Sequence, residues 1–346
     1  MQKMIFVVDD NDINLSVAEE ALDDQYRVMT LPSAAKMFAL LEKFPAPDLI
    51  LLDIEMPEMD GFEALSRLKS SSLYSDIPVI FLTSMTDASV EVRGFQLGVI
   101  DFITKPFSAP VLLNRIKTHL DIDEIIRART AQIESLKNGI VFVLSDMVEN
   151  RDQVTGGHVE RTTMYIEILI KAMLKHSEYA SEINHMDIES LISSARLHDV
   201  GKIAVSDLIL NKPGKLTDEE FEKMKNHTLE GERIIDQIVN RTDNVEFLRN
   251  AKLFTNAHHE RWDGNGYPYG LKGNEIPMQG RIMAIADVYD ALISERPYKK
   301  AFTHEEACKI IKDGAGTQFD PALVEIFLSV KDNFARIEKT ASESQH

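Results

Sequence analysis

The feature that most constrains the fold is a series of short apolar runs in the first third of the chain. Uninterrupted runs of apolar residues fall at 5–8, 49–52 and 79–82. Such runs are typical of parallel strands that are buried on both faces. Segments with helical periodicity separate them, at residues 14–22, 34–42, 61–69 and 89–96. This alternation of strand and helix predicts a doubly wound α/β sheet.

Acidic residues follow the predicted strands, at the edge where open α/β sheets bind ligands. Asp9 and Asp10 follow the first strand, and Asp53 follows the second of the runs. Three converging carboxylates repel one another unless a hard cation holds them, and oxygen ligands suit Mg²⁺. Thr83 and Lys105 follow later strands and bring a hydroxyl and a positive charge to the same edge. A single Asp here would be explained as a turn or N-cap residue, but the five residues together favour a binding pocket.

These residues resemble those of the receiver domain of two-component response regulators. The resemblance covers about residues 1–120 and includes the string at 52–61 and Lys105-Pro106-Phe107. The resemblance implies a five-stranded parallel sheet. It also implies that Asp53 accepts a phosphoryl group from a sensor histidine kinase. Physically, the added charge would draw groups at the sheet edge inward and bias two packings of the opposite face.

The same resemblance assigns roles to the surrounding residues. It implies that Asp10, Asp53 and the Glu55 carbonyl bind Mg²⁺, and that Asp9 acts through water. It further implies that Thr83 and Lys105 contact the phosphoryl oxygens and that Phe102 is the aromatic switch residue.

Residues 121–150 are expected to form a helical connector. Apolar residues fall near the heptad period at Ile126, Ile133, Leu136, Ile140, Val143 and Met147. A sustained heptad pattern is typical of helices that pair with a second copy. Two interpretations remain open at this point: a coiled coil in a homodimer, or a helix packed on its own domain.

Residues 151–346 show helical periodicity and little strand pattern, which predicts an all-α domain. Histidines and aspartates occur there as neighbours, in His198-Asp199 and His258-His259. Neighbouring side chains on a helix point about 100° apart, so each pair can address two metals held roughly 3.5–4 Å apart. The Asp199 carboxylate has two oxygens and can bridge such metals. Imidazole and carboxylate ligands together favour Fe, Mn, Zn or Ni, and the pattern indicates a metal-dependent hydrolase.

Several ordered strings in this region resemble the HD-GYP family over about residues 140–335. They are Thr155-Gly156-Gly157-His158, His198–Lys202, His227, His258–Pro268, Ala286–Leu292 and Arg296–Lys299. The resemblance implies a phosphodiesterase that opens the second messenger cyclic di-GMP to linear pGpG, with GMP as a further product.

The resemblance also implies a set of site residues. The implied metal ligands are His158, His198, Asp199, His227, His258, His259 and Asp287. Lys202 would hold a scissile phosphate oxygen, Arg296 and Lys299 would contact substrate phosphate, and Tyr267 would lie in a substrate-side loop. For Arg296 and Lys299 the alternative is solvated surface charge.

One position departs from the family pattern. Some members have a Glu four residues before the histidine that aligns with His158, where it helps to hold a third metal; this chain has Val154. Valine cannot bind a metal, so we expect a two-metal site, with Fe favoured and Mn²⁺ as a replacement. A different Glu brought close by the fold would change this expectation.

Composition excludes other classes of function. The chain carries 56 Asp and Glu against 38 Lys and Arg, a formal charge of −18, which argues against a protein that coats DNA. A basic helix-turn-helix is also missing from the pattern. One cysteine, Cys308, and the lack of a long apolar run fit a cytoplasmic protein without a membrane anchor.

Two alternative functions remain open. One is hydrolysis of another cyclic dinucleotide, such as a mixed GMP-AMP, because a metal centre recognises phosphate and not the base. The other is a non-catalytic module that binds cyclic di-GMP and signals through contacts.

Overall fold

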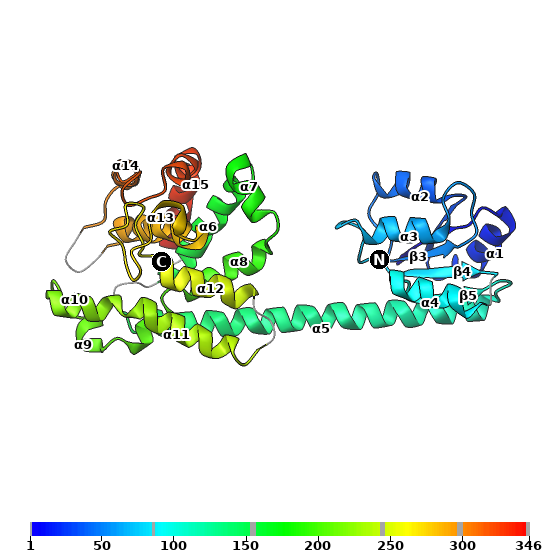
Figure 1. The fold of residues 1–346 in the computed structure, drawn as a ribbon, viewed down its shortest axis with the longest axis horizontal. Helices are drawn as coiled ribbons and strands as arrows, with labels where there is room; N and C mark the ends of the chain where they lie inside the picture. Colours follow the sequence, from blue (N-terminus) through cyan, green and yellow to red (C-terminus); the bar gives the residue numbers. More distant parts are fainter. Residues whose placement is uncertain (1, 85–86, 153–156, 243–245, 296–299, 344–346) are drawn as a thin grey trace. The chain divides into compact units, whose positions relative to one another are not determined.

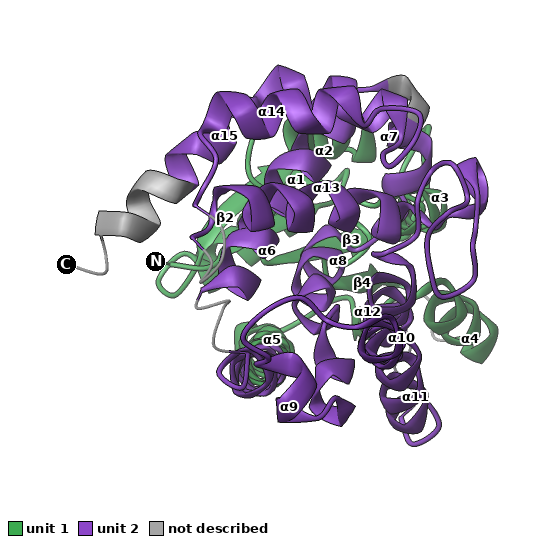
Figure 2. Cartoon of the chain, turned by 90° about the vertical axis from the view of Figure 1, so that its left-hand side faces the viewer, with its two compact units in different colours: residues 1–133 green, residues 134–346 purple. Residues whose placement is uncertain are grey.

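A computed structural model of the chain describes residues 2–84, 87–152, 157–242, 246–295 and 300–343. Val154, Arg296 and Lys299 lie outside these residues. The chain divides into two compact units, Met1–Ile133 and Glu134–His346, which Figure 2 colours separately. In the described part of the chain, no helix combines the length and the apolar character that crossing a bilayer requires.

The first unit is built on one parallel sheet with the strand order β2-β1-β3-β4-β5 (Figure 1). Its elements are β1 (Met4–Val8), α1 (Asp12–Leu22), β2 (Arg27–Leu31), α2 (Ala34–Leu41), β3 (Leu49–Asp53), α3 (Gly61–Lys69), β4 (Val79–Thr83), α4 (Ala88–Leu97), β5 (Asp101–Thr104) and α5 (Ala109–Glu149). The expected five-stranded, doubly wound sheet is therefore confirmed. No uninterrupted apolar run predicts β2 or β5, and each of these strands lies at an edge of the sheet and is partly exposed.

Alternation along the strands produces a core on each face of this sheet. In β1, Phe6 and Val8 pack with α2 and α3, whereas Ile5 and Val7 pack with α1 and the first turns of α5. Successive side chains of a strand point to opposite faces, so a strand covered on both sides must be apolar throughout. The covered sheet leaves its strand ends, and the polar residues that follow them, free to form a pocket.

The second unit is helical, as the sequence predicts. Its elements are α6 (His158–Met173), α7 (Ser177–Ile183), α8 (Ile188–Ser194), η1 (Ala195–Leu197), η2 (Val200–Ala204), α9 (Asp207–Leu210), α10 (Asp218–Lys225), α11 (His227–Val239), α12 (Glu246–Ala257), η3 (Gly273–Glu275), α13 (Met278–Ile293), α14 (His304–Asp313) and α15 (Pro321–Glu343). The last part of α5 also belongs to this unit.

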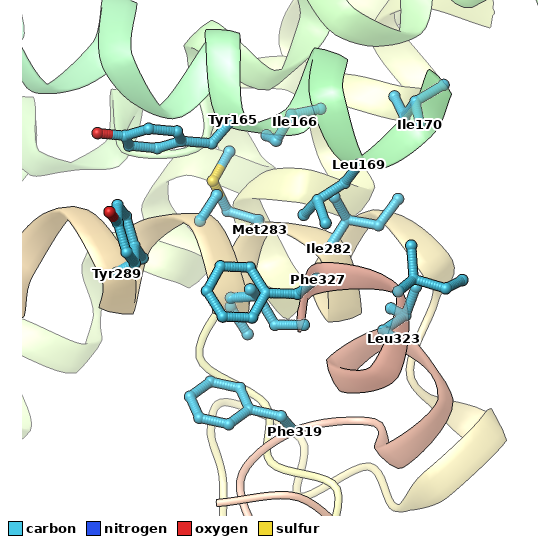
Figure 3. Packing of buried hydrophobic residues seen from close by; sticks show 14 of the residues in the cluster. Tyr165, Ile166, Leu169, Ile170, Ile282, Met283, Tyr289, Phe319, Leu323 and Phe327 are labelled. Atoms are coloured by element: carbon cyan, nitrogen blue, oxygen red, sulfur yellow. The ribbon is translucent and has the colours of Figure 1, made fainter. Parts of the chain in front are cut away.

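The main core of the second unit forms where α6, α13 and α15 meet (Figure 3). Tyr165 of α6 stacks on Phe334 of α15 with ring centroids 4.6 Å apart, and Tyr289 of α13 packs edge-on against both rings. These helices carry apolar residues at helical spacing, as an amphipathic helix that faces a core must. The core fixes the N-terminus of α6 and the middle of α13, where candidate site residues lie.

The connector helix has two different faces within the second unit. Val141, Ser145 and Val148 are buried, and Val141 packs with Leu197 and Ile235. Most of the apolar residues at heptad positions are exposed instead, among them Ile140 and Met147. One face of α5 therefore packs on its own domain and the heptad face remains available.

Gly201 allows two segments of the second unit to approach closely. A Cβ at this position would lie 1.8 Å from the His227 carbonyl oxygen and 2.4 Å from the Gly231 nitrogen, so η2 and α11 meet backbone to backbone. This contact places Asp199 and His227 near each other.

We predict that Gly201→Ala lowers the free energy of unfolding by about 1–3 kcal/mol, because the added methyl group forces the two segments apart. Thermal or urea unfolding of the full chain measures this change. The matched control is Gly139→Ala in α5, where a Cβ would meet nothing within 4 Å. That control should keep or raise stability, since alanine favours a helix over glycine. Equal stabilities of the two variants would contradict the prediction.

Candidate functional site

Histidines converge at the centre of the second unit from helix ends. His158 is the first residue of α6 and His227 the first of α11, His198 lies between η1 and η2, and His258 and His259 directly follow α12. The rings of His158, His198, His227 and His258 are buried. The fold therefore brings together residues that are up to 101 positions apart in the sequence.

The imidazoles face one another in pairs around one carboxylate. The Nε2 atoms of His158 and His198 are 3.4 Å apart, and those of His227 and His258 are 3.3 Å apart. Asp199 Oδ2 lies 3.4 Å from His198 Nε2. Asp199 Oδ1 lies 3.5 Å from His227 Nε2 and 3.7 Å from His258 Nε2. The Asp199 carboxylate thus spans the two groups of histidines.

The outer nitrogens of three of these rings contact backbone carbonyls. The contacts are His198 Nδ1 to the Ala195 oxygen at 3.0 Å, His227 Nδ1 to the Met224 oxygen at 2.7 Å, and His258 Nδ1 to the Phe254 oxygen at 2.9 Å. A carbonyl only accepts, so each Nδ1 carries the proton and each neutral ring turns an Nε2 lone pair inward. Lone pairs that face one another at this separation repel unless a cation lies between them. The donor set therefore fits divalent metals.

Burial keeps the His227, His258 and His259 rings neutral. It lowers the pKa of His227 and, with neighbouring imidazoles, lowers the pKa of His258 far below the ordinary value and that of His259 to about 4. Burial opposes ionisation of Asp199, yet the Lys202 ammonium and the neighbouring His198 hold its pKa well below the usual range. The site therefore offers neutral imidazoles and an ionised carboxylate, the forms that bind metals.

Among the described residues of the second unit, two groups have metal-binding geometry. They are His227, His258 and His259, and His158, His198 and Asp199, each with potential ligand atoms within 4.8 Å of one another. The seventh expected ligand is Asp287 of α13. Its Oδ1 atom lies 3.5 Å from His158 Nε2. All seven expected ligand residues lie at this centre.

The sequence did not reveal the support of His158. Its Nδ1 lies 2.8 Å from Asp290 Oδ2, and Arg161 contacts both oxygens of Asp290, at 2.7 and 2.9 Å. Burial would lower the pKa of His158, but the Asp290 carboxylate raises it. A carboxylate on the outer nitrogen orients a ligand histidine and increases its basicity. Asp290 lies three residues after Asp287 and therefore on the same side of α13. This spacing is the one feature of the local sequence that could have identified Asp290 as a site residue.

Lys202 lies beside the bridging carboxylate. Its Nζ is 2.7 Å from Asp199 Oδ2 and 3.1 Å from Asp152 Oδ2. Burial would lower the pKa of Lys202, but these two carboxylates raise it above the ordinary value. The ammonium is therefore charged and directed at the centre. Sequence analysis missed Asp152, which lies 50 residues from its partner.

The loop after His259 is fixed by a buried carboxylate. Glu260 accepts hydrogen bonds from the backbone nitrogens of Tyr269, at 2.7 Å, and Leu271, at 3.0 Å. Gly266 is needed for close approach, since a Cβ would lie 2.4 Å from the Arg261 nitrogen. The folded loop places the Tyr267 ring 4.7 Å from the His259 ring, centroid to centroid.

The first unit contains a second polar site, at the carboxyl ends of its strands. Asp9, Asp10 and Asp53 form a group with the geometry to hold a cation. Lys105 Nζ contacts Asp9 Oδ2 at 2.7 Å and Asp53 Oδ2 at 2.8 Å. Burial raises the pKa of Asp53 although Lys105 opposes the change. Asn14 Nδ2, which sequence analysis did not select, donates to Asp9 Oδ1 at 3.0 Å.

The other expected residues of this pocket lie at its border. Thr83 is buried at the end of β4, and the Glu55 nitrogen is 3.4 Å from Asp53 Oδ1. Phe102 of β5 packs against Phe81 and Phe95, with centroids 5.6 and 5.1 Å away. The pocket and the aromatic residue thus lie on neighbouring strands.

The doubly wound sheet with its acidic pocket and the helical unit with its histidine centre define a response regulator joined to a metal-dependent hydrolase domain. The response regulator receiver domain matches residues 5–117, and the HD domain matches residues 142–323. The chain belongs to the HD domain family and combines it with a receiver domain. It is a metal-dependent phosphodiesterase.

The chain is similar to several cyclic dinucleotide phosphodiesterases. A probable cyclic di-GMP phosphodiesterase of Vibrio cholerae is 39% identical over 99% of this chain and 81% of that protein. The cyclic di-GMP phosphodiesterase response regulator RpfG of Xanthomonas campestris is 35% identical over 81% of this chain and 75% of that protein. A 3'3'-cGAMP-specific phosphodiesterase 2 of Vibrio cholerae is 39% identical over 57% of this chain and 35% of that protein.

We predict that Asp290→Asn weakens metal binding by about 10- to 100-fold, because His158 loses the charge that orients and polarises it. Titration of the metal-free full chain with Mn²⁺ measures the change. The matched control is Asp313→Asn, an exposed position at the end of α14, which should bind as the wild type does. Unchanged affinity in Asp290→Asn would contradict the supporting role.

Proposed function

We propose that the protein hydrolyses cyclic di-GMP to pGpG, with pGpG or GMP as the final product, and that phosphorylation of Asp53 by a sensor histidine kinase controls this activity. The observation that carries the catalytic proposal is the Asp199 carboxylate between two groups of histidines, with Lys202 beside it. The names of the relatives support the choice of substrate. The proposed substrate, a second messenger, and the proposed kinase partner support a location in the cytoplasm.

The proposed catalytic centre holds two divalent metals, Fe or Mn. One metal would be held by His158, His198, Asp199 and Asp287. The other would be held by His227, His258 and His259, with Asp199 shared between the two. When bound, two such metals supply Lewis acidity that activates water and stabilises charge developing on phosphorus.

The chain's own groups would orient the substrate. The charged Lys202 ammonium would hold a scissile phosphate oxygen and offset its negative charge. Tyr267 would line the substrate side of the centre, and Arg296 and Lys299 would contact substrate phosphate. These positive groups and the metals would attract an anionic substrate to a chain whose formal charge is −18.

In the first unit, we propose that Mg²⁺ binds at Asp10, Asp53 and the Glu55 carbonyl, with Asp9 acting through water. Thr83 and Lys105 would contact the phosphoryl oxygens on Asp53, and Phe102 would respond to the movement of Thr83. The proposed domains are a receiver at 1–120, a helical connector at 121–150 and a catalytic domain at 151–346. The exposed heptad face of α5 supports a homodimer that pairs through this helix.

A second candidate function is hydrolysis of a different cyclic dinucleotide. One relative is named as specific for 3'3'-cGAMP, and a centre that binds phosphate does not select a base. Parallel assays with cyclic di-GMP and 3'3'-cGAMP distinguish the two substrates. Binding without turnover of either nucleotide would favour the non-catalytic signalling module.

We predict that Fe- or Mn-loaded protein converts cyclic di-GMP to pGpG or GMP, and that Asp199→Ala reduces turnover more than about 100-fold by removing the shared carboxylate. Chromatography of the nucleotides measures both. Asp53→Ala is the matched control, because it removes a carboxylate from the other unit. Elemental analysis should give two Fe or Mn per chain. An intact substrate with every metal would defeat the enzyme proposal, and a content near three would defeat the two-metal proposal.

We predict that beryllium fluoride with Mg²⁺, which mimics the phosphoryl group, changes the rate of hydrolysis or the mass of the protein in solution. The physical reason is added negative charge at Asp53, which Lys105 already contacts and which would draw Thr83 inward. Turnover assays and light scattering measure the two effects, and Asp53→Asn should not respond. Identical rates and identical mass would contradict regulation while leaving the catalytic proposal intact.

A further inference from the structure

Helix α10 carries a phenyl ring that core packing does not explain. A capping box between Thr217 and Glu220 starts this helix, and none of its residues is buried. Phe221 is 46% exposed. A single exposed apolar residue is ordinary on a protein surface. Phe221 is not isolated, however, because it ends a series of ring contacts.

That series leads from the metal centre to the surface. The His259 and Tyr267 rings lie 4.7 Å apart with planes tilted by 32°. The Tyr267 and Phe221 rings lie 6.4 Å apart and are nearly perpendicular, at 80°. Each step moves outward from a candidate metal ligand to a ring that faces water.

A cation accompanies the two outer rings. Lys225 Nζ lies 5.0 Å from the centroid of Phe221 and 5.5 Å from that of Tyr267. It also pairs with Glu222 Oε1 at 2.7 Å. An ammonium within about 6 Å of a ring centroid is attracted by its π-electrons, so Lys225 restrains both rings.

We propose that Phe221 is the stacking surface for a purine base of the substrate, beside the phosphate that the metal centre holds. This inference rests on the proposed function, because a cyclic dinucleotide places each base one ribose away from a phosphate. Tyr267 borders the ribose between them, and Lys225 keeps the rings oriented. Aromatic rings bind bases through their faces, and stacking also removes exposed apolar surface from water.

Stacking has a consequence for specificity. Every purine offers a similar π-face, so a stacking ring strengthens binding of guanine and adenine alike. Phe221 therefore increases affinity for cyclic di-GMP and for mixed GMP-AMP to a similar degree. Selection between the two bases depends on hydrogen bonds made elsewhere.

The test compares Phe221→Leu and Phe221→Trp in the metal-loaded full chain. Leucine keeps an apolar side chain but has no π-face, so Phe221→Leu should raise KM for cyclic di-GMP by about 5- to 150-fold and change kcat much less. Phe221→Trp should keep KM near the wild-type value. A cyclic dinucleotide with one 2-aminopurine base gives a direct signal, because stacking quenches its fluorescence. Wild type and Phe221→Trp should quench it, and Phe221→Leu should not.

The matched control is Ile310→Ala, which shortens another exposed apolar residue on α14 of the same unit and should leave KM and quenching unchanged. Thermal melting of all variants confirms that they fold. Equal KM and equal quenching in Phe221→Leu and wild type would overturn the stacking proposal while the proposed function stands. Quenching by wild type without hydrolysis would support stacking and contradict catalysis. Neither quenching nor hydrolysis by wild type would contradict both.

Discussion

Convergence of neutral imidazoles on the Asp199 carboxylate is the constraint on which the second unit depends. Burying so many polar nitrogens is unfavourable unless each finds a partner. The partners come from helix ends, where the last carbonyls of a helix lack an internal hydrogen bond. Phe254, in the last turn of α12, supplies such a carbonyl to His258. The Ala195 carbonyl, which also accepts from the His198 backbone nitrogen, contacts His198 Nδ1. The short helices around the centre therefore satisfy the outer nitrogens and turn the inner nitrogens toward one point.

Both units balance buried carboxylates with a single lysine. Lys105 joins Asp9 to Asp53 in the first unit, and Lys202 joins Asp152 to Asp199 in the second. A buried carboxylate left without a partner would take up a proton instead of remaining charged. Lys105 thus opposes the rise in the pKa of Asp53, and Lys202 helps to hold the pKa of Asp199 low. Ionised carboxylates suit the proposed phosphoacceptor site in one unit and the proposed metal centre in the other.

Much of the fold and of the site could be predicted from the sequence, for reasons of pattern. Strands buried on both faces must be apolar, so the runs ending at Val8, Leu52 and Leu82 stand out. Edge strand β2 does not, because its partial exposure removes the need for an apolar run. Four of the seven candidate ligand residues occur in two distinctive adjacent pairs, His198-Asp199 and His258-His259. Asp290 and Asp152 carry no comparable mark, since a lone aspartate is ordinary and their partners are distant in the sequence.

The sequence by itself determined the class of each domain, the metal-binding chemistry and the residues able to provide it, because those depend on residue type and short-range order. The tertiary structure alone decided which groups meet. It placed Asp199 between two histidine pairs, set Arg161 and Asp290 behind His158, and brought α10 beside the loop of Tyr267. The physical reason is that packing of helices far apart in the chain fixes these distances, and Gly201 permits the closest approach among them.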